Sequence, residues 1–99
     1  MLEELRKDKF AKSGAGARDS WWATWQKVHH VMCPQSEVLP LSSESIEAVS
    51  AAFKAAKYVS FPNYVHRAKA AHIEDLPRHR VPWTQDLEQC MQDCKRDQS

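Results

Sequence analysis

The sequence predicts an all-α protein, a small orthogonal bundle of four to five helices in a single domain. Apolar residues recur every three to four positions along most of the chain, and residues that cap helices precede these segments. No segment alternates apolar and polar residues long enough to indicate a strand. The chain has 99 residues, of which 42% are hydrophobic and 27% are charged, which is typical of one globular domain.

The amino-terminal residues 1–18 differ in character from the rest of the chain. Residues 2–12 carry Leu2, Leu5 and Phe10 among charged side chains, and this pattern predicts a weak helix. Residues 13–18 are small and include both glycines of the chain, so we expect a flexible hinge there. We therefore divide the chain into a weak helix with a hinge, 1–18, and a helical domain, 19–99.

The first helix of the domain is expected to run from a cap at Asp19 or Ser20 to about residue 32, just before Pro34. Its apolar stripe consists of Trp21, Trp22, Trp25, Val28 and Met32, with His29 beside it. Such a stripe is more often core than a platform on which bases stack. Trp22 lies off the main stripe, and we expect it to be partly exposed.

Two further helices are predicted over residues 43–57 and 61–74. Ser42 is the expected cap of the first, whose apolar face consists of Ile46, Val49, Ala52, Phe53 and Ala56. Ser60 is the expected cap of the second, and Pro62 is acceptable in its first turn. The apolar side of this helix consists of Tyr64, Val65, Ala68, Ala71 and His72.

The carboxyl-terminal part is predicted to be a loop followed by one helix. Residues 75–83 contain two prolines and a basic cluster, which favours a loop. Thr84 is the expected cap of a helix over residues 85–96, and Trp83 before it is expected to pack on the bundle. The buried stripe of this helix consists of Leu87, Cys90, Met91 and Cys94.

The sequence contains no pattern typical of an enzyme. Gly14 and Gly16 are too few for a loop that cradles phosphates, and no serine stands in a Gly-x-Ser-x-Gly turn. Cys33 with His29 or His30 would be helical neighbours without an orienting carboxylate or oxyanion donors. We therefore predict no catalytic activity, no cofactor and no small-molecule substrate.

The cysteines indicate the compartment. Cys33, Cys90 and Cys94 are an odd number, and the amino terminus lacks a signal-peptide core, so we expect reduced thiols in an intracellular protein, nuclear if the source is eukaryotic. Cys90 and Cys94 with His72 or His79 are a remote zinc alternative, because structural zinc sites usually take thiolates from tight turns. We predict no metal. No apolar run approaches the ~20 residues of a membrane span.

Basic residues are frequent between positions 54 and 80: Lys54, Lys57, His66, Arg67, Lys69, Arg78, His79 and Arg80. They would form a positive strip for phosphates or an ordinary solvated face, since Glu74 and Asp75 flank them, and the pattern alone leaves both open. The formal net charge of +1 argues against strong non-specific DNA binding by the chain alone.

The chain carries short motifs in a specific order: Ser20-Trp21-x-x-Thr24-Trp25-x-x-Val28-His29, Val38-Leu39-Pro40-Leu41-Ser42, Ile46-x-x-Val49-x-x-Ala52-x-Lys54, Tyr58-x-Ser60-x-x-Asn63-Tyr64, Ala68-Lys69-x-x-His72-Ile73 and Trp83-Thr84-x-x-Leu87. This order, over about residues 19–97, resembles the N-terminal SAM-like, core-binding domain of tyrosine recombinases and phage-type integrases. It is similar in particular to recombinase-like proteins of eukaryotic mobile elements.

The resemblance implies a helical bundle that clamps one side of duplex DNA, while a separate catalytic domain cleaves with a tyrosine. Tyr58 and Tyr64 fall at bundle positions, so we expect no strand cleavage by this chain alone. The positions that match the contacting helices of the family are Lys54, Lys57, Ser60, Asn63, Arg67 and Lys69, and the basic strip adds Arg78 and Arg80.

Two functions follow as hypotheses. The first is a DNA-binding module without activity of its own, whose partners are duplex DNA, bound weakly by the module alone, and a catalytic recombinase domain or another protein. The alternative is a helical protein–protein interaction module derived from a mobile element. In that case Trp22 and the segment with Leu2, Leu5 and Phe10 would be the docking features.

Overall fold

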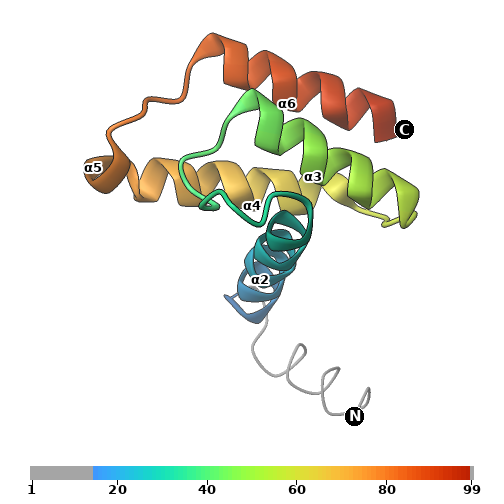
Figure 1. Ribbon diagram of the computed structural model, residues 1–99. Coiled ribbons are helices and arrows are strands. Elements are labelled where there is room, and N and C mark those ends of the chain that lie inside the picture. Colours follow the sequence, from blue (N-terminus) through green and yellow to red (C-terminus); the bar gives the residue numbers. More distant parts are fainter. Residues whose placement is uncertain (1–14, 99) are drawn as a thin grey trace.

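The computed structural model describes residues 15–98 and confirms the all-α prediction (Figure 1). The helices of this part are α2 (Ala15–Met32), α3 (Ser43–Ala55), α4 (Phe61–Glu74), α5 (Leu76–His79) and α6 (Gln85–Gln98), and it contains no strand. The predicted weak helix over 2–12 lies outside the described residues.

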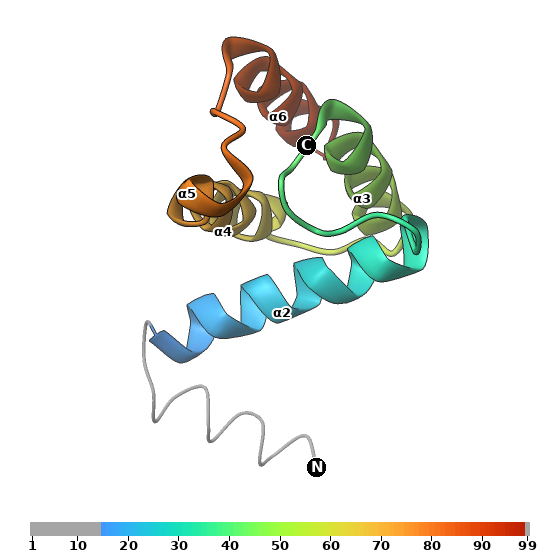
Figure 2. The ribbon, with the colours of Figure 1, turned by 60° about the vertical axis from the view of Figure 1, so that its left-hand side comes forward.

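The helices pack in two directions. Helices α3 and α6 lie side by side, α4 runs in the opposite direction to both, and α2 crosses the other helices steeply (Figures 1 and 2). Helix α2 packs on α3 and α4, and α6 packs mainly on α3 and also on α4. No described helix combines the length and the apolar character that crossing a membrane requires.

The amino-terminal boundary of the first helix was predicted incorrectly. Helix α2 begins at Ala15, so residues 15–18 are a helical turn rather than a hinge, and Asp19 and Ser20 lie inside the helix instead of capping it. Alanine is the best helix former, and a glycine near a helix start weakens the helix by only about 1 kcal/mol. Here the alanines outweigh Gly16 because the tryptophans that follow hold the helix on its neighbours.

The start of α3 is capped as predicted. The hydroxyl of Ser42 accepts from the amide of Ser45 at 3.1 Å, and the Ser45 hydroxyl accepts from the amide of Ser42 at 3.0 Å. Each side chain therefore satisfies a backbone donor that the helix itself leaves unpaired.

We expect replacement of Ser42 by alanine to lower the free energy of unfolding by about 1 kcal/mol, because the amide of Ser45 loses its acceptor. The measurement is urea denaturation followed by circular dichroism. Ser43→Ala is the matched control, since no cap bond uses the Ser43 hydroxyl. Equal stability of both variants would contradict the role of the cap.

Helix α3 ends two residues earlier than predicted. Lys57 has φ 59°, in the left-handed region that favours glycine. The amide of Lys57 donates to the carbonyl of Lys54 at 3.0 Å, and the amide of Tyr58 donates to that of Phe53 at 3.0 Å. These two bonds form a Schellman motif that stops the helix at Ala55.

The expected cap at Ser60 is absent and the expected loop 75–83 is partly helical, whereas the expected cap at Thr84 is present. Ser60 precedes α4, but it has φ 65° and its side chain makes no cap bond, because capping normally requires an extended backbone. The predicted loop 75–83 contains the short helix α5, in whose first turn a proline is tolerated. Thr84, in contrast, accepts from the amide of Leu87 at 3.2 Å at the start of α6.

The core lies where the four longer helices meet. It contains the predicted apolar residues Trp25, Ile46, Val49, Phe53, Val65, Ala68, Leu87, Cys90, Met91 and Cys94, together with Val38, Leu41 and Phe61. Met32 and Ala56 were predicted to be buried and are exposed, because each lies at or beyond the carboxyl end of its helix. Trp22 is half-buried against the core.

Two histidines fasten the connection between α4 and α6. The Nδ1 atom of buried His72 accepts from the amide of Leu41 at 3.1 Å, and its Nε2 donates to the carbonyl of Val81 at 2.7 Å. The Nδ1 atom of His79 accepts from the amide of Val81, and its Nε2 donates to the carbonyl of His72, both at 3.0 Å. In each ring Nδ1 accepts and Nε2 donates, so each histidine links two segments of the backbone.

Candidate nucleic-acid interface

The structure separates the eight predicted contact residues into distinct groups along α4. Lys54, Lys57, Ser60 and Asn63 lie at the end where α3 turns into α4, whereas Arg78 and Arg80 lie at the opposite end, on and after α5. Helix α4 has 14 residues, so these ends are about 20 Å apart. Arg67 and Lys69 lie between the two groups.

Arg67 and Lys69 point to opposite flanks of α4. Side chains that are two residues apart on a helix point in directions about 160° apart around the helix axis. Accordingly Arg67 pairs with Glu74 on the side of α2, and Lys69 pairs with Glu88 of α6 at 2.8 Å. The predicted residues therefore do not form one continuous basic strip.

Four of the six predicted basic residues are engaged in ion pairs. Lys54 pairs with Asp97 at 3.1 Å, Arg67 with Glu74 at 3.3 Å, Lys69 with Glu88 at 2.8 Å, and Arg78 with Asp75 at 2.7 Å. Lys57 and Arg80 form no ion pair with another described residue. These two remain available to a phosphate without the loss of an internal partner.

The pair of Lys69 and Glu88 belongs to a structural cluster at α6. Glu88 also accepts from the Trp83 indole at 2.8 Å and from Gln92 at 2.8 Å, and the Lys69 ammonium lies 5.3 Å from the Trp83 ring centre. These hydrogen bonds, that of Lys69 first, lower the pKa of the Glu88 carboxyl to about 2. Lys69 therefore holds the connector to α6, which makes it a poor candidate for a DNA contact.

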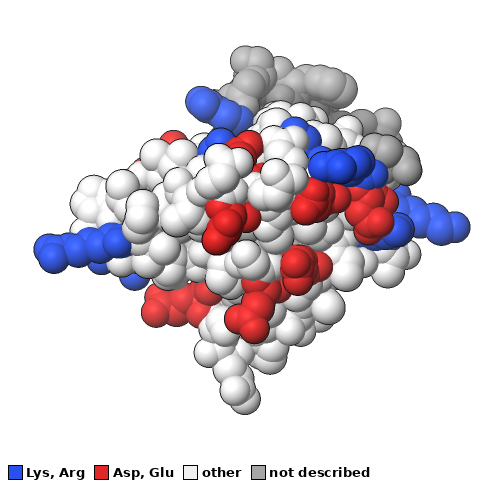
Figure 3. Space-filling view, turned by 90° about the horizontal axis from the view of Figure 1, so that it is seen from above, with Lys and Arg blue, Asp and Glu red and all other residues white. Residues whose placement is uncertain are grey.

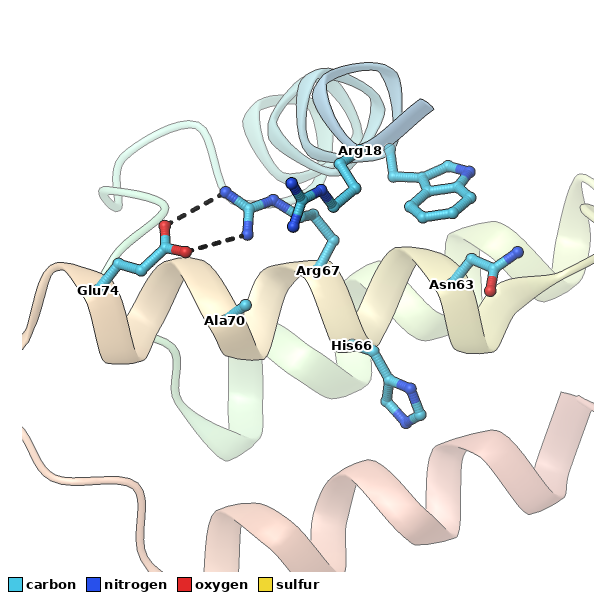
Figure 4. Close-up of a pocket in the computed structure, with 7 residues that line it drawn as sticks. Arg18, Asn63, His66, Arg67, Ala70 and Glu74 are labelled. Atoms are coloured by element: carbon cyan, nitrogen blue, oxygen red, sulfur yellow. Dashed lines mark hydrogen bonds and ion pairs between the residues drawn. The ribbon is translucent and has the colours of Figure 1, made fainter. Parts of the chain in front are cut away.

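A groove between α2 and α4 brings Arg18, which the sequence did not single out, together with the predicted contact residues Asn63 and Arg67 (Figure 4). It has a volume of about 240 Å³ and is lined by Arg18, Trp21, Asn63, His66, Arg67, Ala70 and Glu74. Arg18 was assigned to the hinge. Once α2 is extended by one turn, the spacing of three between Arg18 and Trp21 places both on one helix face.

The side chains of the groove differ in what they offer a ligand. The exposed Arg18 makes no ion pair with another described residue, whereas Arg67 holds Glu74 through both terminal nitrogens, at 3.3 and 3.4 Å. Figure 4 shows the His66 ring directed away from α2, and its Nε2 lies 3.0 Å from Lys95 Nζ. Burial, followed by the positive charge of Lys95, lowers the pKa of His66, so the ring is neutral at pH 7.

The opposite side of the molecule is acidic. Figure 3 shows carboxylates gathered near the middle of the face formed by α3 and α6, with cations toward its edges. The exposed acidic residues of these two helices are Glu44, Glu47, Asp86, Asp93 and Asp97. A phosphate backbone would be repelled by the carboxylates of this face.

The potential metal ligands of the described part lie apart or have other partners. No cluster of three or more potential metal ligands occurs among the described residues. The ring nitrogens of His72 and His79 are already bonded to the backbone, and burial raises the pKa of the Cys90 thiol to about 11. No protein-family model, curated protein or solved structure matches the chain.

Proposed function

We propose that this chain is a DNA-binding module of a recombinase-like protein and has no strand-cleaving activity of its own. The interface is the surface around the amino end of α4, formed by Arg18, Lys57, Ser60, Asn63 and Arg67. The order of motifs described above supports the recombinase-like assignment, since the resemblance implies a small all-α bundle whose middle helices contact DNA.

The distribution of charge is the observation that carries the proposal. The exposed carboxylates of α3 and α6 lie on one face, while Lys57 and Arg18 form no ion pair with another described residue. A net charge of +1 therefore does not prevent binding, because only the contacting surface must be positive. Phosphate contacts of this kind make the affinity dependent on salt.

Lys57 offers a test in which loss of binding cannot result from loss of folding. Lysine at φ 59° is strained by roughly 1 kcal/mol relative to glycine. We therefore expect Lys57→Gly to stabilise the fold and at the same time to weaken binding to paired duplex DNA. The loss should be smaller at about 200 mM than at about 50 mM salt, because one phosphate contact is missing.

The measurement is a fluorescence-anisotropy titration with a labelled paired duplex at both salt concentrations. Arg96→Gly is the control for charge, since Arg96 is exposed on the acidic side and pairs only with Asp93 at 3.0 Å among the described residues. Equal losses of affinity in the two variants would mean that only the net charge of the protein matters, and this would contradict the proposed surface. Undetectable binding of the unmodified protein at low salt would contradict DNA binding itself.

The alternative of a protein-interaction module stays a prediction. Trp22, one of its expected docking features, is half-buried against the core, and the segment with Leu2, Leu5 and Phe10 lies outside the described residues. The observation that favours this alternative is the exposure of Val31 and Val59, 77% and 80%. A mass that increases with concentration in light scattering is the result it requires.

A further inference from the structure

Trp21 is a large aromatic residue that lies outside the hydrophobic core formed by the described residues. Trp25 lies within the core cluster and Trp22 packs against it, whereas Trp21 is half-buried and lines the α2–α4 groove. The π-face of every nucleic-acid base stacks on accessible aromatic rings. An indole at the wall of an open groove is therefore a suitable surface for a base.

The charged groups of this groove favour an anion beside that surface. Arg18 and Arg67 contribute two positive charges to its lining and Glu74 one negative charge, so the balance is positive. The Nε atom of Arg67 is buried and has no hydrogen-bond partner among the described residues. Guanidinium groups bind phosphate oxygens with paired hydrogen bonds, and Arg18 is free of any described ion partner.

The size and the remaining polar group of the groove limit the ligand further. Its volume of about 240 Å³ is below the range of roughly 300–1,000 Å³ that drug-sized ligands occupy. This favours a single nucleotide over a longer stacked segment. Asn63, at the same groove, carries an amide that both donates and accepts, as the edge of a base requires.

We propose that the α2–α4 groove holds one unpaired nucleotide of a DNA strand. Its base stacks on Trp21 with the Asn63 amide at its edge, and its phosphate lies against Arg18 and Arg67. This inference rests on the DNA-binding function proposed above and specifies the form of DNA that the interface prefers. That form is a duplex with an extruded base, in place of a fully paired one.

The test uses two labelled duplexes that differ only in one bulged position, which carries adenine in one and no base in the other. Backbone charge and bending are then matched, and only the base can stack. We expect the unmodified protein to bind the adenine bulge at least about fivefold more tightly than the abasic one, because stacking of the base on the indole adds that much affinity. In Trp21→Leu this ratio should fall to about one.

Trp22→Leu is the matched control, because Trp22 directly follows Trp21 in α2 but lies outside the groove. This variant should keep the ratio. Circular dichroism of both variants verifies folding. Equal affinity of the unmodified protein for both bulges, with binding of the paired duplex intact, would overturn this inference alone. Persistence of the ratio in Trp21→Leu would also overturn the inference about the groove. Absence of binding to any duplex at about 50 mM salt would overturn the proposed function as well.

Discussion

Replacement of Phe53 by alanine is expected to remove about 3–5 kcal/mol from the free energy of unfolding. Phe53 is fully buried and is the centre of the aromatic cluster in the core. Its ring centre lies 4.7–5.8 Å from those of four other rings, namely Tyr58, Tyr64, Phe61 and Trp25. Alanine would therefore leave a cavity that three helices and a turn surround.

The loss is large for a domain of this size, whose total stability is about 5–15 kcal/mol. Urea denaturation followed by circular dichroism measures it. Val59→Ala removes apolar atoms from a side chain that is 80% exposed, and we expect a change within about 0.5 kcal/mol. A loss below 1 kcal/mol in Phe53→Ala would mean that the aromatic cluster is packed differently from the arrangement described here.

Replacement of His72 by alanine is expected to cost at least about 3 kcal/mol. The amide of Leu41 would lose its acceptor and the carbonyl of Val81 its donor, and each unpaired buried group costs about 1–3 kcal/mol. The cavity left beside the Trp83 ring, whose centre is 5.5 Å from that of His72, adds to this loss. His66→Ala, on the exposed side of the same helix, is the control and should change stability little.

His72 also predicts how stability depends on pH. Burial lowers the pKa of the His72 imidazole, outweighing the opposing effects of the Val81 hydrogen bond and the Asp75 charge, and nearby His79 lowers it further. The His72 ring of the unfolded chain then binds a proton more readily than that of the folded chain. The contribution of neutral His72 to the free energy of unfolding is therefore complete above pH 6.5. It is lost progressively as the pH falls below 6.5 toward the folded pKa.

Urea denaturation of the unmodified protein at pH 7.5 and 5.5 tests this prediction, with an NMR titration of the His72 ring alongside. We expect lower stability at pH 5.5 and a ring that stays neutral below its ordinary pKa. Protonation of His72 at pH 6.5 or above without unfolding would contradict the hydrogen bond from Leu41, because an imidazolium has no acceptor.

The sequence predicted best those features that depend on neighbouring residues. Helix α4 has the predicted bounds because Pro62 fixes its first turn, and the stripe of α6 is buried at all four predicted positions. The cap at Ser42 also depends only on local spacing, and it was found as expected. The start of α2 was missed because alanines and glycines alternate there, and their opposing preferences are resolved only by packing.

The candidate site was harder to predict because its charges are neutralised over long distances in sequence. Lys69 meets Glu88, 19 residues away, and Lys54 meets Asp97, 43 residues away. No local pattern reveals such pairs, so the basic residues appeared to be a strip. Likewise, the crossing of α2 over α4 decides that Trp21 faces the groove while Trp22 packs on the core.

Binding of DNA to the surface around the amino end of α4 can be observed directly by NMR. The measurement is a map of backbone amide shifts of the whole chain on addition of a paired duplex at about 50 mM salt, where phosphate contacts are strong. We expect the largest changes at Arg18 and between Lys57 and Arg67, with α6 unaffected. Changes centred on the acidic face of α3 and α6, or none at saturating duplex, would contradict it.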